Sequence, residues 1–174
     1  MPDLLTHYAT TLLLTSRVSR VRYAVLTALI GLLPDVDSLL RIHRWFTHSL
    51  IITALATAVA AVIITYVNSE LLKYVFLTSA IYTLHILLDM FTASTPIAWP
   101  LTNKAYMISI ELNGAIASDG LNISLNTALV NTTADFTPKQ IVEGPIVTEQ
   151  GIIVAIGVGA TLIFEKTFLR KDRV

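Results

Sequence analysis

The chain has 174 residues, enough for one domain, and it is 54% hydrophobic but only 14% charged. A typical soluble domain is about 25% charged, so this composition excludes an ordinary soluble protein. Twelve basic and twelve acidic residues cancel, so net charge gives no reason to expect a nucleic-acid partner. The chain has no cysteine, which excludes disulfides and thiolate metal sites.

Two short apolar segments, residues 4–15 and 21–33, come first, separated by a turn with three arginines. Each has about 12 residues, too few to cross the hydrocarbon core of a bilayer alone. They predict a short helical hairpin, either re-entrant or built of tilted helices. Pro34 is expected to end its second arm, because the residue before a proline avoids the helical region.

Three longer apolar segments follow, residues 49–68, 72–92 and 151–169. Each is close to the ~20 residues that span a bilayer as a helix. The sequence therefore predicts an all-α membrane protein with the short N-terminal hairpin and about three transmembrane helices. We expect a single membrane domain over 1–174, in which 1–92 carry the functional helices and 151–170 form the last span.

Residues 93–150 form a long polar connection between the second and third of these spans. They include four prolines, many Asn and Thr residues, and an Ile-rich stretch over 106–112. A structureless loop of this length would be unusual, so short strands or a hairpin are expected in this extramembrane insertion.

Histidines and aspartates gather in four short clusters at the ends of the apolar segments. A charged or coordinating group beside hydrocarbon is costly unless it has a partner, and one metal ion can serve several such groups. Helix connectivity brings all four clusters to one membrane side, and the pair at i and i+4 in the last cluster shares a helix face. The predicted ligands are His7, Asp35, Asp37, His43, His48, His85 and Asp89.

Imidazole and carboxylate ligands favour a divalent metal, with Zn²⁺ preferred and Mn²⁺ or iron as alternatives. Seven candidate ligands suffice for one or two ions. Each residue alone has a simpler reading: a lone His is usually a structural hydrogen-bonder, and Asp35 and Asp37 could cap a turn after Pro34. Arg44 could anchor to lipid phosphate. The metal interpretation depends on the seven candidate ligands taken together.

Basic residues lie at the span ends opposite the clusters, and the positive-inside rule places such ends in the cytoplasm. We therefore expect a multi-pass protein of the cell membrane with a cytoplasmic C-terminus and an outward-facing metal site. The 93–150 insertion, which is acidic overall, would face outward too. The basic residues are Arg17, Arg20, Arg22, Lys73, Arg170, Lys171 and Arg173.

Four of these motifs, in this order, resemble the YdjM-type (DUF457) family of membrane-bound metal-dependent hydrolases. They are Met1-Pro-Asp-Leu-Leu-Thr-His7, Gly31-Leu-Leu-Pro-Asp35-Val-Asp37, His43-Arg44-Trp-Phe-Thr47-His48-Ser49 and His85-Ile-Leu-Leu-Asp89, followed by Trp99-Pro100. The resemblance implies a membrane hydrolase that uses divalent metal. Two positions differ: Trp45 stands where glycine is common, and Ala93-Ser94-Thr95 replaces a glycine-containing segment.

Metal-assisted hydrolysis is the function that the residues themselves favour. A bound divalent ion activates water near neutral pH, Asp35 or Asp37 could bridge two ions, and Arg44 suits a phosphate oxygen. A site at the interface would meet head groups, so the expected substrate is a phosphoester in a lipid or lipid-linked molecule. The alternative is non-catalytic: a metal-stapled membrane scaffold, or a metal or proton transporter.

Overall fold

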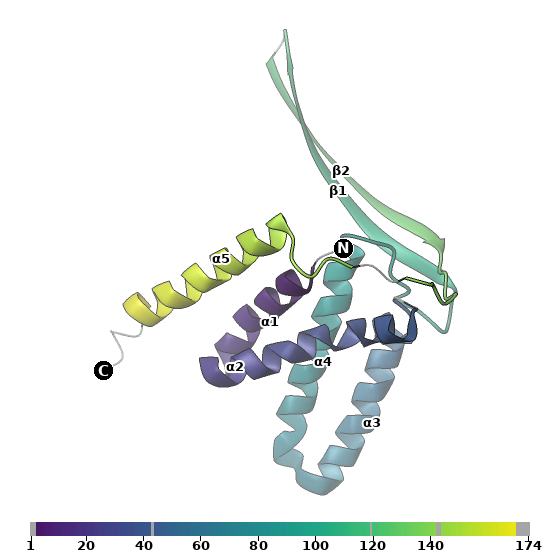
Figure 1. Cartoon of the computed structure of the whole chain (residues 1–174), viewed down its shortest axis with the longest axis vertical. Helices are drawn as coiled ribbons and strands as arrows, with labels where there is room; N and C mark the ends of the chain where they lie inside the picture. Colours follow the sequence, from purple (N-terminus) through teal and green to yellow (C-terminus); the bar gives the residue numbers. More distant parts are fainter. Residues whose placement is uncertain (1–2, 43, 119, 142–143, 170–174) are drawn as a thin grey trace.

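The computed structural model describes residues 3–42, 44–118, 120–141 and 144–169. Helices α1 to α5 and the 3₁₀ and π segments next to them make up most of the described residues, and a two-stranded hairpin projects from one end of the helical body (Figure 1). Within the described ranges, three helical segments are long and apolar enough to cross a membrane: Arg22–Leu40, Leu50–Met90 and Glu149–Phe168. The second of these folds back on itself as two antiparallel helices.

Helices α3 (Leu50–Asn68) and α4 (Leu72–Met90) form this folded-back pair, joined by the short 3₁₀ helix η3 (Ser69–Leu71). The most apolar stretch of this pair buries none of its residues inside the protein, as expected where lipid is the solvent, whereas the C-terminal part of α4 buries Ile81, Ile86 and Met90. Ser49 caps α3 by accepting a hydrogen bond from the Ile52 N–H at 3.2 Å. The helices predicted over 49–68 and 72–92 are confirmed.

The N-terminal hairpin consists of α1 (Leu4–Val18) packed against α2 (Val21–Thr27) and the 3₁₀ helix η1 (Ala28–Leu40). The prediction that Pro34 ends the second arm is wrong, because η1 continues through Pro34 to Leu40. Proline fixes φ near −65°, which a 3₁₀ helix accepts. The second arm is therefore one continuous segment of membrane-spanning length rather than a short one.

Helix α5 (Glu149–Phe164), extended by the π turn η4 (Glu165–Leu169), packs along α1 and confirms the third predicted span. Asp3 joins the two helices at their N-termini. Its buried carboxylate accepts one hydrogen bond from the Thr6 N–H at 2.6 Å and another from the Thr148 N–H. Gly151 lies directly against this carboxylate, where a Cβ would not fit. One aspartate thus caps α1 and fastens α5 to it.

Replacing Asp3 by asparagine is expected to lower the free energy of unfolding by about 1–3 kcal/mol, because the amide nitrogen cannot accept the second hydrogen bond. Burial raises the pKa of Asp3, but hydrogen bonds from Thr6 and Thr148 outweigh it and hold the pKa below its ordinary 3.8. A carboxylate with a lowered folded-state pKa stabilises above about pH 4 and loses this effect as the pH falls further.

Thermal unfolding in detergent at pH 7 and pH 3 tests this expectation. The difference between wild type and Asp3→Asn should be large at pH 7 and shrink at pH 3. Glu111→Gln, at an exposed position of β1, is the control and should differ little from wild type at either pH. An equal difference for Asp3→Asn at both pH values would contradict the proposed role of the carboxylate.

The extramembrane insertion forms an antiparallel hairpin of β1 (Lys104–Ala117) and β2 (Gly120–Thr133), fourteen residues each. Paired backbone hydrogen bonds of 2.9 Å between Thr95 and Tyr106 fix its base to the helices. The strand content expected around 106–112 is confirmed, but the hairpin is longer than the Ile-rich stretch that indicated it. Figure 1 shows the hairpin extending away from the helical body.

Candidate metal centre

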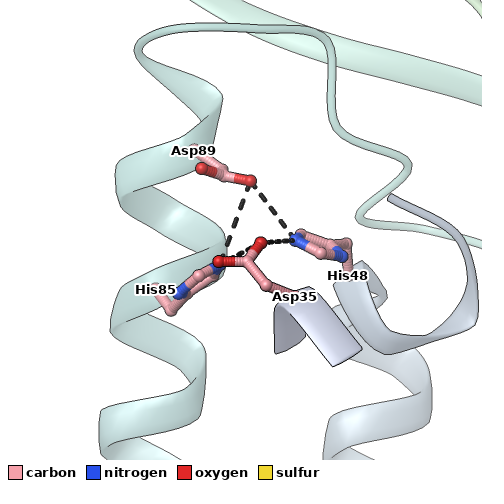
Figure 2. A group of neighbouring side chains, drawn as sticks. All are labelled: Asp35, His48, His85 and Asp89. Atoms are coloured by element: carbon pink, nitrogen blue, oxygen red, sulfur yellow. Dashed lines mark ion pairs between the residues drawn. The ribbon is translucent and has the colours of Figure 1, made fainter. Parts of the chain in front are cut away.

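Four side chains from three separate parts of the chain converge at one end of the helical body. His85 and Asp89 lie one turn apart on α4, Asp35 comes from η1, and His48 ends the short 3₁₀ helix η2 (Phe46–His48). Figure 2 shows their polar atoms pointing toward a common centre. Within the described residues, these four are the group with the geometry to hold a metal ion, with one ligand atom from each and all atoms within 4.8 Å.

The spacing of the four atoms is close to that around a tetrahedral ion. His48 Nε2 lies 3.6 Å from Asp35 Oδ1 and 3.3 Å from Asp89 Oδ2. His85 Nε2 lies 3.5 Å and 4.0 Å from the same two oxygens. An ion with ligand bonds of about 2.0–2.2 Å in tetrahedral geometry separates its ligand atoms by about 3.3–3.6 Å. Three of these four nitrogen–oxygen separations match that range, and the fourth, at 4.0 Å, would have to shorten around an ion.

The imidazole of His85 is oriented by a backbone carbonyl. Its Nδ1 donates to the Gly31 carbonyl oxygen at 2.6 Å, which leaves the lone pair of Nε2 facing the two carboxylates. Gly31 sits against Thr11 of α1, where a Cβ would overlap the threonine hydroxyl. The absence of a side chain at Gly31 brings η1 close enough for this hydrogen bond. A second hydrogen bond of this kind is typical of metal-ligating histidines.

The imidazole of His48 is oriented by Asp37, whose Oδ2 lies 3.1 Å from His48 Nδ1. The same oxygen accepts hydrogen bonds from the Trp45 N–H at 2.8 Å and the Thr47 hydroxyl at 2.6 Å. The structure thus places Asp37 behind His48, on the side away from the common centre. This position suits an orienting carboxylate better than a ligand or a bridge between two ions.

The pKa of His48 shows that the cluster favours a positive charge. Burial lowers the pKa of His48, but hydrogen bonds to Asp35, Asp37 and Asp89 outweigh it and raise the pKa to about 10. The carboxylates therefore favour a cation at this imidazole. A divalent ion can supply the same positive charge to the carboxylates, with both imidazoles as neutral ligands.

Asp89 also contacts two further residues, His7 and Arg44. Its Oδ1 lies 3.3 Å from His7 Nε2, and the His7 ring stacks on His85 with ring centres 3.8 Å apart. Its Oδ2 accepts a hydrogen bond from Arg44 Nε at 2.8 Å. His7 therefore adjoins the four-residue group without belonging to it. His43, also predicted as a ligand, lies outside the described residues.

Arg44 is the fixed positive charge at this cluster. Its backbone is in the left-handed region, with φ of 61°, and its side chain is only 9% exposed. Nε is used by Asp89, whereas Nη2 is buried and has no hydrogen-bond partner among the residues that the structure describes. A buried guanidinium nitrogen without a partner is costly, so a ligand with an acceptor oxygen is expected there.

Access to the centre comes from the side of Asp35. The Asp35 side chain is 19% exposed, whereas those of His48, His85 and Asp89 are at most 2% exposed. Beyond the cluster, Trp45, Trp99 and Phe136 pack together with ring centres 6.2–6.4 Å apart; Trp99 makes T-shaped contacts with the other two rings, which are tilted relative to each other. The insertion thus contributes aromatic residues close to the loop that carries Arg44.

Two residues that position the centre were not singled out from the sequence. Gly31 acts through its backbone carbonyl, and every residue type has a backbone carbonyl, so the sequence does not indicate this role. Asp3 acts at a distance by fastening α5 to α1. A glycine often marks a place where another part of the chain approaches the backbone closely, and the Gly31-Leu-Leu-Pro-Asp35 segment contains such a glycine.

A membrane protein with antiparallel apolar helices and a buried His–Asp group at one helix end is the class that this fold and site define. A profile of a known family, described as YdjM inner membrane protein, matches residues 2–165. The chain therefore belongs to the YdjM family. Comparison with curated proteins and with solved structures finds no match.

Proposed function

We propose that the protein is a membrane-embedded, metal-dependent hydrolase of a phosphoester in a lipid or lipid-linked molecule. The observation that carries the proposal is the pairing of a four-atom metal-binding geometry with Arg44 Nη2, which is buried beside it and has no hydrogen-bond partner among the described residues. A purely structural metal site needs only the four ligands and gives no role to this buried guanidinium donor.

The ligand set of two imidazoles and two carboxylates favours Zn²⁺, with Mn²⁺ and iron as alternatives. Such an ion would supply a Lewis acid and a water whose pKa is lowered toward ~7. We assign one ion to His48, His85, Asp35 and Asp89. Because these four ligands would fill a tetrahedral shell, the water would bind as a fifth ligand. Asp35 has the most exposed side chain of the four, which supports exchange of water or substrate on its side.

The remaining residues act on the substrate or on the ligands. Arg44 would hold a phosphate oxygen through Nη2 while Nε keeps its hydrogen bond to Asp89. Asp37 would fix the tautomer and direction of the His48 ring. His7, which lies 3.3 Å from Asp89 Oδ1, is placed to take or give a proton beside the reacting group.

We further propose that the metal centre faces outward and the C-terminus lies in the cytoplasm. The turn with Arg17, Arg20 and Arg22 supports this, as does Lys73 at the far end of α4, because such residues favour the cytoplasm. An ion pair between Arg17 and Glu165 places the basic turn beside the C-terminal end of α5. These ends lie away from the hairpin in Figure 1.

Cysteine labelling tests this orientation on a chain that has no cysteine of its own. A cysteine at Ser118, in the turn of the hairpin, should react with an impermeant thiol reagent on intact cells. Cysteines at Ser19 and Lys171 should react only after the cells are opened. Reaction at Ser19 and Lys171 with protection at Ser118 would invert the orientation and place the centre on the cytoplasmic side.

The proposed activity itself is tested with purified protein. Elemental analysis should find about one divalent ion per chain, and the metal-loaded protein should hydrolyse at least one member of a panel of phosphomonoesters, phosphodiesters and phospholipids. Chelation should remove the activity, and readdition of the metal should restore it. A metal-loaded protein that cleaves nothing in the panel would favour the metal-stapled scaffold.

A further inference from the structure

A groove runs along the α3–α4 pair, within the segment of membrane-spanning length. Its volume is about 640 Å³, and its walls are almost entirely apolar, with no Asp, Glu, Lys or Arg among the lining residues. Small side chains such as Ala56 and Ala60 keep it open on the α3 side. The hydroxyl of Thr57 is satisfied within the wall, by the Thr53 carbonyl at 2.7 Å and the Ser79 hydroxyl at 2.8 Å.

The dimensions of the groove indicate what it can hold. Its α3 wall, from Ile52 to Ile64, is about 18 Å long at 1.5 Å per residue, so its mean cross-section is roughly 35 Å². A hydrocarbon chain is about 4–5 Å across, from the contact distance of its carbons, and fits this section. A helix is about 10 Å across and needs roughly twice the area.

One end of the groove lies next to the residues that surround the metal centre. Thr47 and Tyr82 line that end; Thr47 precedes His48 in the chain and its hydroxyl donates to Asp37, and Tyr82 lies three residues before His85 on α4. A ligand whose chain lay in the groove would therefore have its head group on the side of the centre where Thr47 and Tyr82 lie. A largely apolar lining without charged residues does not favour a polar partner. A hydrocarbon chain, by contrast, can bind such a surface without polar contacts.

We propose that the α3–α4 groove binds the hydrocarbon chain of the substrate, so that the protein selects phosphoesters attached to a long chain. This inference rests on the proposed function and specifies its substrate class. The groove positions the chain, and Arg44 and the metal ligands act on the head group. Long-chain substrates should then have a lower KM than short-chain esters with the same head group.

The test compares a long-chain lipid phosphoester with a short-chain, water-soluble ester of the same head group. Ala60→Phe fills the groove away from the centre and should lower kcat/KM on the long-chain substrate by about tenfold or more. It should leave the short-chain ester and the bound metal unchanged. Ala58→Phe, at an exposed α3 position outside the groove, is the matched control and should behave as wild type on both. Equal loss on both substrates, or no loss on either, would overturn the proposal.

A binding measurement keeps this test separate from that of the hydrolase. A phospholipid with a photoreactive diazirine on its acyl chain, in vesicles of phosphatidylglycerol and phosphatidylethanolamine, should crosslink to groove residues of α3 and α4 in wild type and less in Ala60→Phe. Crosslinking with no hydrolysis would reject the activity and keep the groove. Crosslinks spread evenly over α3 would reject the groove as the binding site. Disulfide-linked dimers of Ala60→Cys would also reject the proposal, because they would show that a second copy of the chain occupies the groove.

Discussion

Replacing His85 by alanine is expected to lower the metal content of the purified protein by about tenfold or more and to remove the stabilisation that metal gives. His85 supplies one of the four ligand atoms, and the Gly31 carbonyl fixes the direction of its ring. Because the folded protein binds the ion and the unfolded chain does not, loss of a ligand also lowers thermal stability. His48→Ala and Asp89→Ala should behave alike.

The control for this prediction is the next residue along α4. Ile86 is fully buried, so Ile86→Ala should cost about 2–5 kcal/mol of stability through the cavity it leaves, yet it should retain the metal. Metal content by elemental analysis, and unfolding with and without a chelator, separate the two effects. His85→Ala should unfold at the same temperature with or without the chelator. Normal metal content in all three ligand variants would refute the site.

Asp37→Asn provides an intermediate case in the same experiment. The asparagine keeps an acceptor for part of the Trp45 and Thr47 hydrogen bonds but loses the negative charge behind His48. Orienting residues of this kind change metal affinity by about 10–100-fold, less than a ligand does. A loss of metal as complete as that in His85→Ala would instead show that Asp37 is a ligand, the role that the sequence predicted for it.

Arg44→Lys is expected to keep the metal and lose turnover by about 10²-fold or more. Lysine preserves the positive charge near Asp89 but not the planar fork, in which Nε holds the carboxylate while Nη2 remains for the substrate. The loss should appear in kcat/KM for the phosphoester, with elemental analysis unchanged. A variant that lost its metal as well would show that Arg44 supports the ligands rather than the substrate.

Arg41→Lys is the matched control for Arg44→Lys. Arg41 also has a left-handed backbone, with φ of 60°, but its side chain is exposed. The same chemical change there should leave both metal and turnover as in wild type. If turnover fell equally in both variants, the effect would come from this loop as a whole and the phosphate-binding role of Arg44 would be rejected.

Much of the centre could be predicted because helix periodicity and connectivity determine it. His85 and Asp89 share a face of α4 by their spacing, and two antiparallel apolar helices return this face to the level of His48. Asp35 follows from the same logic on the N-terminal side. His43 remains a prediction, since it lies outside the described residues.

The parts that could not be predicted depend on contacts between distant backbone groups. Sequence places Asp35 and Asp37 together as ligand candidates, but only the direction of η1 decides that one faces the centre and the other backs His48. That direction depends on the chain passing through Pro34 as a 3₁₀ helix, where the rule for residues before proline predicted an end. Asp3 and Thr148 are far apart in sequence, and no local pattern reports their hydrogen bond.

The separation between Asp89 and Thr148 also sets an order of events during synthesis. All four ligands of the centre lie between residues 35 and 89, and roughly 60 further residues must be added before Thr148 can meet Asp3. At ribosomal rates of about 5–20 residues per second, this takes roughly 3–12 s. An ion at this centre could therefore be bound by a nascent chain whose last helix has not yet entered the bilayer. Fastening of α5 would then close a protein that is already loaded.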